Sequence, residues 1–168
     1  GNVMGSRGSV IPLFLENAKT GVLKITDPEM TRFNITLKEA ILFVFNCLER
    51  NIGGEIFVPK IPSYKITDVA DAISPNSKKE LLGLRPGEKI HEEMITKYDA
   101  FNTIDLGKYY AILPSNSKVF EEYTQRGIKF SKVSNDFAYN SGENEHFLTI
   151  KEIQSLIKKN IDIEFKPI

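Results

Sequence analysis

The spacing of apolar residues predicts two helices whose starts are marked by capping boxes. Thr36-Leu37-Lys38-Glu39 places a hydroxyl and a carboxylate where each can satisfy a free amide at a helix start, and Thr149-Ile150-Lys151-Glu152 repeats the pattern. After each box, apolar residues recur three or four positions apart. These residues are Ala40, Ile41, Val44, Phe45 and Leu48 in the first helix, and Ile153, Leu156, Ile157 and Ile161 in the second.

Three shorter helices are predicted from turn signals. Residues 8–20 follow a loop of glycine and serine and stop at Gly21, which favours a helix ending with a glycine. Residues 67–73 begin with Thr67-Asp68 and precede a Ser-Pro-Asn turn. Residues 88–95 follow an Arg-Pro-Gly turn, and we expect a short helix there as well.

Strands are predicted where short runs alternate or are rich in β-branched and aromatic residues. The predicted strands cover residues 23–26, 79–84 and 109–113, with a buried strand at residues 55–59. Residues 115–146 are polar and weakly patterned, so they are expected to be rich in loops. The chain therefore reads as α/β.

Charge and composition exclude several classes of function. Lysine and arginine together number 22, as do aspartate and glutamate, so no basic surface predicts nucleic-acid binding. The longest apolar run, residues 41–45, is too short for a bilayer, and no membrane partner is expected. Cys47 is the one cysteine, so no internal disulfide or metal cluster is expected, and the cytoplasm is the default compartment.

Four motifs place glycines or arginines where an anion could be held. They are residues 1–9 (GNVMGSRGS), 30–33 (MTRF), 53–60 (GGEIFVPK) and 85–89 (RPGEK). A glycine-rich loop before a helix can turn its amides toward a phosphate, although an ordinary tight loop has the same composition.

The two arginines of these motifs have two interpretations each. Arg32 and Arg85 suit a bidentate grip on phosphate or carboxylate, but a surface ion pair is the simpler interpretation of either alone. Glu88 either compensates a helix dipole in the first turn or accepts a hydrogen bond from a ligand hydroxyl.

Other reactive residue types give no catalytic signal. His91 lacks the second histidine of a zinc helix and is expected on a helix face, and His146 is expected in solvent. Cys47 lies in an apolar helix, which favours a small core residue over a nucleophile. None of the six tyrosines is followed by lysine four residues later, so a dehydrogenase Tyr-x-x-x-Lys pair is absent from these 168 residues.

Taken together and in order, these motifs resemble the carboxyl-terminal half of the inverting UDP-N-acetylglucosamine 4,6-dehydratases. The likeness extends through residues 61–68, 83–89, 102–105, 108–110 and 139–142. It implies the last part of an NADP-binding Rossmann-type extended short-chain dehydrogenase with its small substrate-binding lobe. It assigns residues 1–114 to the end of that core and the lobe, and residues 115–168 to a loop-rich segment and final helix.

The resemblance also implies a reaction and a pathway. NADP would take hydride from sugar C4, water would leave across C5 and C6, and hydride would return to C6. Reprotonation of C5 on the opposite face gives UDP-2-acetamido-2,6-dideoxy-beta-L-arabino-hex-4-ulose, for surface polysaccharide or pseudaminic-acid-type glycans. The acid–base residues of the family match nothing here and are expected upstream of Gly1, so this chain alone is expected to be inactive.

Binding roles carry over to matching positions. The substrate-binding residues implied by the resemblance are Asn2, Met30, Arg32, Arg85 and Glu88, with both arginines on phosphate and Glu88 on the ribose. The cofactor side implied by the resemblance is Val3, Met4, Gly5, Ser6 and Arg7.

Two other functions stay open on the sequence. The first is a related nucleotide-sugar epimerase or retaining dehydratase, because the residues that decide between these reactions are not in the chain. The second is a UDP-sugar-binding remnant without catalysis. The resemblance further implies self-association of the full-length enzyme.

Overall fold

The computed structural model describes residues 2–115 and 117–168, and for Asn2 and Ser117 the backbone alone. Contacts divide the chain into two compact units, each built from separated segments. Unit 1 combines Gly1–Leu37, Ile61–Glu92 and Ser141–Ile168, and unit 2 combines Lys38–Lys60 and Glu93–Asn140. The mixed α/β class is confirmed, whereas the division after residue 114 remains a prediction.

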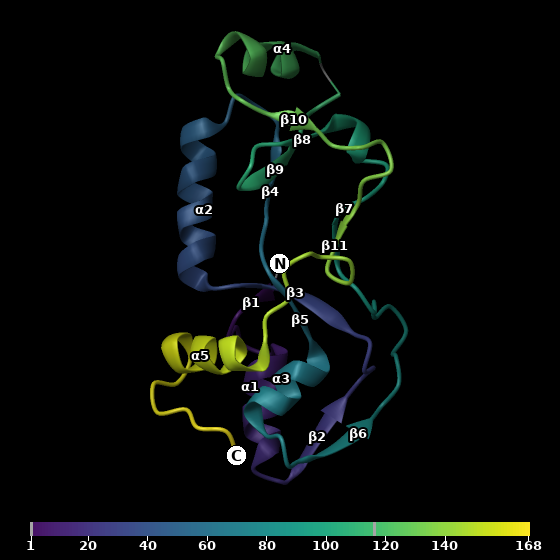
Figure 1. The fold of residues 1–168 in the computed structure, drawn as a ribbon, viewed down its shortest axis with the longest axis vertical. Helices are drawn as coiled ribbons and strands as arrows, with labels where there is room; N and C mark the ends of the chain where they lie inside the picture. The colour runs from purple at the N-terminus through teal and green to yellow at the C-terminus, as the bar shows by residue number, and fades with distance from the viewer. Residues whose placement is uncertain (1, 116) are drawn as a thin grey trace. The chain divides into compact units, whose positions relative to one another are not determined.

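Two small sheets form the strand framework of unit 1 (Figure 1). In the first, β3 (Thr31–Ile35) lies between β1 (Asn2–Val3) and β5 (Ser63–Lys65), parallel to β1 and antiparallel to β5. In the second, β2 (Val22–Ile25) pairs in parallel with β6 (Lys78–Leu81). Parallel neighbours need a crossover connection, and the chain between β2 and β6 contains helices.

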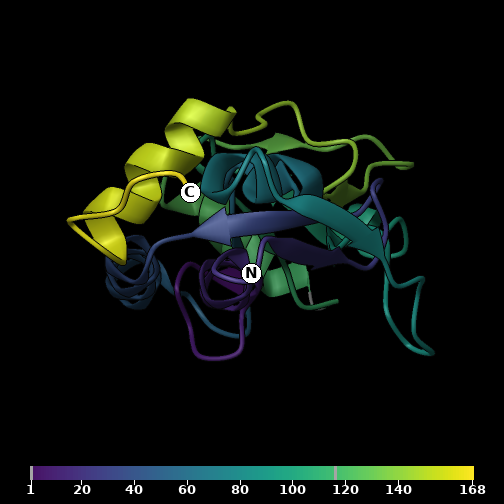
Figure 2. The same cartoon turned by 90° about the horizontal axis from the view of Figure 1, so that it is seen from below.

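Three helices cover these strands and share one apolar core. They are α1 (Val10–Ala18), α3 (Ile66–Ile73) and α5 (Ile150–Asn160), and both views show α5 beside α3 (Figures 1 and 2). The fully buried core side chains include Ile11 and Phe14 of α1, Leu23 and Ile25 of β2, Val69 and Ile73 of α3, and Ile153 and Ile157 of α5. Packing among segments so distant in sequence makes unit 1 one cooperative body.

The start of α5 carries the predicted capping box. The Thr149 hydroxyl accepts the Glu152 amide at 3.3 Å, and the Glu152 carboxylate accepts the Thr149 amide at 2.8 Å. Lys158 and Lys159 in the last turn complement the negative end of the helix dipole. This helix therefore has favourable chemistry at both ends.

Unit 2 is built on a four-stranded antiparallel sheet. Its strands, in the order β10-β8-β9-β4, are Ser131–Lys132, Thr103–Asp105, Tyr109–Ile112 and Ile56–Pro59. The unit also contains a ribbon of β7 (Glu93–Ile95) and β11 (Tyr139–Asn140), a short helical turn at Ala100–Asn102, and the helices α2 (Leu37–Arg50) and α4 (Ser117–Gln125).

Helix α2 presents apolar side chains to solvent. None of its residues is buried, and Phe45 and Leu48 are 61% and 68% exposed. Leu37, Ile41, Val44, Phe45 and Leu48 follow helical spacing along one face. Exposed apolar stripes of this kind are typical of interaction surfaces.

Most predicted helices and strands are confirmed. The structure forms helices at all four segments predicted before residue 74 or after residue 148, and strands at β2, β6 and β9. The strand predicted at residues 55–59 is present as β4, but it is not buried as a whole, because Ile56 is exposed and Val58 alone is fully buried.

One predicted helix is absent. Residues 88–95 do not form a helix: residues 88–92 are irregular, and β7 follows because it pairs with β11 far along the chain. Most described residues of the segment 115–146 lie outside helices and strands, as predicted, but the segment also holds α4, whose Tyr123 packs in the core of unit 2. No helix among the described residues has the length and apolar character needed to cross a membrane.

We predict that Thr149→Ala lowers the free energy of unfolding by about 1 kcal/mol, the usual effect of losing a helix cap. Urea denaturation of the two proteins measures the difference. Hydrogen bonds from the Thr149 amide and hydroxyl hold the pKa of Glu152 below its ordinary value. A lowered folded-state pKa stabilises the fold at neutral pH, so part of the difference should disappear as the pH falls below about 4.

Thr124→Ala is the matched control. Its hydroxyl bonds to the Phe120 carbonyl within α4 at 3.2 Å and caps no helix start. This variant should unfold close to wild type. An equal loss in both variants would contradict the capping role of Thr149.

Candidate anion-binding site

One cavity in unit 1 collects most of the residues predicted to bind substrate. It has a volume of about 540 Å³ and is lined by Met30, Arg32, Arg85 and Glu88, four of the five predicted positions. The volume lies in the usual range of small-molecule sites. The other described lining residues are Gly8, Ser9, Val10, Leu13, Phe14, Asn17, Lys24, Thr26, Tyr64, Ile66 and Leu82. The fifth predicted residue, Asn2, has its side chain outside the described part.

The charges around this cavity favour an anion. Lys24, Arg32 and Arg85 bring three cations to its wall, against one carboxylate, Glu88. The whole chain is neutral, so this excess is local. A concave wall with one sign of charge raises the local concentration of ligands of the opposite sign.

Arg32 is held in place by its own strand and by the segment before β7. Its Nη1 donates to the carbonyls of Thr31 at 2.7 Å and Ile90 at 3.0 Å, and its Nε lies 3.8 Å from Glu92 Oε1. The Glu92 carboxylate also accepts the Phe33 amide at 3.0 Å. The surface ion pair that the sequence allowed for Arg32 therefore exists, with Glu92. It involves the Nε side of the guanidinium, and the same side chain also lines the cavity.

Arg85 sits on a tight turn that Glu88 closes. The Glu88 amide donates to the Arg85 carbonyl, and the Glu88 carboxylate accepts the Arg85 amide, both at 3.0 Å. Gly87, with φ of 86°, provides the left-handed backbone that this turn needs. The interpretation of Glu88 as a first-turn helix acid is wrong, because no helix follows, whereas its position in the cavity wall agrees with the alternative of a ligand contact. Within the described part of the chain, the Arg85 side chain has no ion pair.

Lys24 and Tyr64 are two of the lining residues that the sequence analysis did not predict. Lys24 lies between the buried Leu23 and Ile25, so strand alternation turns it away from the core, a signal that was available in the pattern. Tyr64 reaches the cavity because it pairs with Arg32 across β3 and β5. Nothing local in the sequence indicates that pairing.

A hydrogen-bond network behind Arg32 joins three distant segments. The buried Thr31 hydroxyl lies 2.8 Å from His91 Nδ1 and 2.7 Å from the Ser141 hydroxyl. Ser141 in turn accepts the Glu92 amide at 2.9 Å. His91 is exposed but is not on a helix, so its predicted setting is wrong, and its ring is anchored to a buried group. The network fixes the backbone from which Glu92 reaches Arg32.

The predicted cofactor residues lie beside the cavity wall without lining it. Val3 is in β1, and Met4 is buried in the core. Ser6 closes a turn by donating its amide to the Val3 carbonyl at 3.1 Å. The left-handed φ of Gly5, 75°, is required there, and a Cβ would approach Ile161 to 2.9 Å. Arg7 is exposed and has no ion pair among the described side chains.

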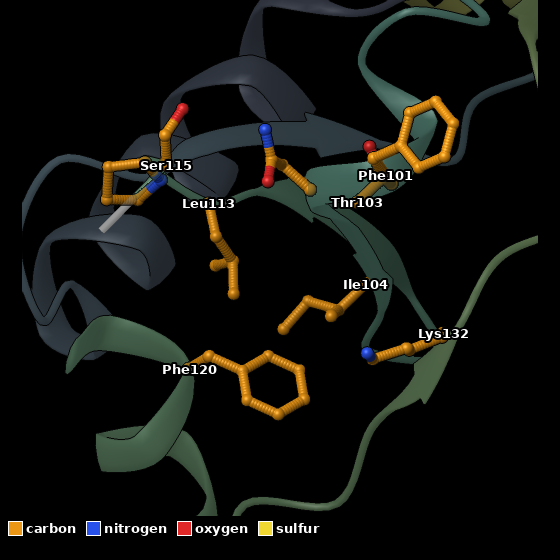
Figure 3. A pocket seen from close by; sticks show the side chains of 9 residues that line it. Phe101, Thr103, Ile104, Leu113, Ser115, Phe120 and Lys132 are labelled. Carbon is orange, nitrogen blue, oxygen red and sulfur yellow. The ribbon is translucent and has the colours of Figure 1, made fainter. Parts of the chain in front are cut away.

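A second cavity, in unit 2, is smaller and has a mixed polar and apolar lining (Figure 3). Its volume of about 210 Å³ falls below the usual range of ligand sites. The Phe120 ring and the side chains of Ile104 and Leu113 extend into it, and the Lys132 amine lies 4.9 Å from the Phe120 ring centre. Its one cation is thus already paired with an aromatic ring, and this cavity gives no sign of a phosphate site.

Metal and thiol chemistry find no support in the described residues. These residues contain no cluster of three or more histidine, cysteine, aspartate or glutamate side chains that could hold a metal ion. Cys47 is half-buried, and burial raises the pKa of its thiol, which opposes nucleophilic character. His146 is exposed, as predicted.

Comparison with known proteins gives a family and several relatives. The family model described as polysaccharide biosynthesis protein matches residues 1–114. A UDP-N-acetylglucosamine 4,6-dehydratase (inverting) from Campylobacter jejuni is 45% identical over 163 residues, covering 94% of this chain and 49% of the relative. This similarity confirms the resemblance seen in the motifs.

Other relatives carry a different activity in their names. A UDP-glucose 4-epimerase from Rickettsia canadensis is 35% identical over 163 residues, covering 94% of this chain and 47% of the relative. The X-ray structure of Pen from Bacillus thuringiensis superposes with a TM-score of 0.77 at 30% identity, covering 95% of this chain and 47% of that one. The chain spans about half the length of the curated relatives it matches.

We predict that Gly142→Ala destabilises unit 1 through His91. A Cβ at position 142 would lie 2.6 Å from His91 Nδ1, so the ring would have to leave the Thr31 hydroxyl. Overpacking of this kind costs about 1–3 kcal/mol, measurable by urea denaturation. The φ of Gly142 is not positive, so backbone strain does not add to the effect.

The double variant supplies the control for this clash. His91→Ala removes the ring that a Cβ would meet, so adding Gly142→Ala to it should cost much less than in the wild-type background. Equal costs in both backgrounds would show that His91 is not the reason for glycine at position 142.

Proposed function

Because the chain belongs to the polysaccharide biosynthesis protein family, we propose that it binds the nucleotide sugar in an inverting UDP-N-acetylglucosamine 4,6-dehydratase. The observation that carries this proposal is the cavity of unit 1, where four predicted substrate residues meet. They come from separate segments of the sequence, and folding brings them to one wall.

The diphosphate of the substrate is assigned to the cationic side of the cavity. Arg85 has a guanidinium without an ion pair in the described part, on a turn closed by Glu88. Arg32 enters the same cavity from β3, and Lys24 from β2. Two planar guanidinium groups can each bind two phosphate oxygens, and a lysine adds a point charge. Of the two Glu88 oxygens, Oε2 is used in closing the turn, which leaves Oε1 to accept a ribose hydroxyl.

The opening loop offers groups that could bind an anionic part of the cofactor. Arg7 is an exposed cation, and Gly5 and Gly8 hold left-handed backbone conformations that let the chain approach a ligand closely. We assign the cofactor side to Val3–Arg7 and the cofactor to NADP, as the resemblance implies. When bound, the nicotinamide would accept hydride from sugar C4 and return it to C6. The residues of this chain bind and orient, and none is assigned proton transfer.

The proposed product follows from elimination across C5 and C6 with inversion at C5. It is UDP-2-acetamido-2,6-dideoxy-beta-L-arabino-hex-4-ulose, an intermediate for surface polysaccharide or pseudaminic-acid-type glycans, and the proposed compartment is the cytoplasm. The UDP-glucose 4-epimerase name among the relatives favours epimerisation at C4 as the second candidate. The two reactions differ in product: the dehydratase removes one water from the sugar, and the epimerase removes none. Mass spectrometry of UDP-N-acetylglucosamine incubated with the enzyme and NADP separates them.

Self-association is proposed on the apolar face of α2. Phe45 and Leu48 stand on that face among several exposed apolar neighbours, and burying them against a second copy removes apolar surface from water. We expect light scattering to give a mass of at least two chains, and Leu48→Lys to reduce it to one. A wild-type mass of one chain would contradict the proposal.

Arg85→Ala tests the proposed function most directly. Loss of a charge-assisted hydrogen-bond pair should weaken the binding of UDP-N-acetylglucosamine by about 10- to 100-fold in calorimetric titration. The NADP content should not change, because Arg85 lines the cavity whereas none of the residues assigned to the cofactor, Val3–Arg7, does.

Lys89→Ala provides a charge-matched control. Lys89 is an exposed cation four residues away and is not among the described residues that line the cavity. It should bind the nucleotide sugar like wild type. Undiminished binding by Arg85→Ala, or an equal loss in both variants, would overturn the role of Arg85.

A further inference from the structure

Tyr64 is the least expected side chain in the cavity wall. Its residue exposure is 4%, and its ring packs in the apolar core of unit 1. Tyr64 also lines the cavity that holds Arg32, Arg85 and Lys24. A phenol can satisfy both settings at once, because it has an apolar body and a polar tip.

The Tyr64 hydroxyl is not enclosed in the apolar core. It makes no hydrogen bond with any described residue, yet no buried side-chain oxygen or nitrogen of the described part lacks a partner. The hydroxyl oxygen is therefore not sealed in the core. Tyr64 lines the cavity that holds the arginines, which makes its hydroxyl a candidate ligand contact there.

Strand register places Tyr64 opposite Arg32. Arg32 and Tyr64 are directly opposed in the antiparallel pair of β3 and β5. Opposed residues project from the same face of a sheet, with Cβ atoms about 4.5–5.5 Å apart. The register thus sets a phenol and a guanidinium next to each other on the cavity side.

Arg32 keeps donors free for the same ligand. Its Nη1 is used by the Thr31 and Ile90 carbonyls and its Nε faces Glu92, whereas Nη2 has no hydrogen-bond partner among the residues described. The Arg32 side chain is 19% exposed, so it is not closed off from the cavity. Nη2 and the Tyr64 hydroxyl are both donors, and donors on one wall suit an anionic oxygen.

We propose that the Tyr64 hydroxyl donates a hydrogen bond to a phosphate oxygen of the bound nucleotide sugar, next to the contact made by Arg32. This inference rests on the proposed function and adds a ligand-binding residue to the same site. Tyr64 binds and positions the diphosphate and takes no part in proton transfer.

Electrostatics keep the phenol in its donor form. Burial raises the pKa of Tyr64 above its ordinary value, the Glu92 carboxylate raises it further, and Arg32 opposes them with a smaller effect. The neutral hydroxyl therefore persists through the whole range of pH in which the protein is handled. A phenolate would repel phosphate, and this setting prevents its formation.

The test is calorimetric titration of wild type and Tyr64→Phe with UDP and with uridine. The phenylalanine ring keeps the apolar packing, so the variant should fold normally, as thermal unfolding can verify. Loss of a hydrogen bond to a charged oxygen should weaken UDP binding by about 10- to 100-fold. Uridine binding should be unchanged, because uridine has no phosphate. Tyr98→Phe, at a side chain 91% exposed, is the matched control and should bind like wild type.

Three other results of these titrations would each contradict a specific claim. If wild type binds UDP and Tyr64→Phe binds it equally well, the role of Tyr64 is wrong and the proposed function stands. If uridine and UDP weaken equally, Tyr64 contacts the nucleoside, and the phosphate assignment is wrong. If wild type binds neither UDP nor UDP-N-acetylglucosamine, the proposed function fails and this inference fails with it.

Discussion

The pairing of β3 on both of its edges is the constraint on which the rest of the site depends. Because β3 hydrogen-bonds to β1 and β5, its register cannot slip without breaking two ladders. Alternation along β3 then buries Thr31 and Phe33 and places Arg32 on the cavity side. A shift of one residue would exchange these faces and bury the guanidinium. The same register sets Tyr64 opposite Arg32, so one strand pairing determines two of the proposed ligand contacts.

Glu92 connects this strand to the cavity chemistry. Its carboxylate accepts the Phe33 amide and pairs with Arg32, and its own amide is held by Ser141. The Thr31 hydroxyl closes the group by contacting Ser141 and His91. Buried polar groups are costly unless each is satisfied, and a satisfied group of this kind holds a single geometry. The orientation of Arg32 is therefore built into the fold before any ligand arrives.

Local sequence signals were sufficient to predict the helices that begin with a capping box. The capping box at Thr149 and the apolar spacing behind it predicted α5 correctly, and the same logic held for α2. The failure at residues 88–95 has a non-local cause. Residues 88–95 look helical alone, but β7 gains its partner from β11, more than forty positions later in the chain. The site followed the same rule, since Arg85 was visible in its motif and Tyr64 needed a pairing that no local pattern carries.

The two interpretations of Arg32, surface ion pair and ligand contact, are compatible in the folded protein. Glu92 engages Nε at 3.8 Å, longer than a direct hydrogen bond, and backbone carbonyls hold Nη1. These contacts fix the plane of the guanidinium and still leave Nη2 as a donor. A pre-oriented group loses less conformational entropy on binding than a free side chain, so the ion pair favours ligand binding. Arg85, on its turn without a charged partner in the described part, supplies charge to the same cavity with less constraint. Arg32 would thus fix the position of a ligand, and Arg85 would add attraction. Together they suit a diphosphate, whose two charged groups must be held at once.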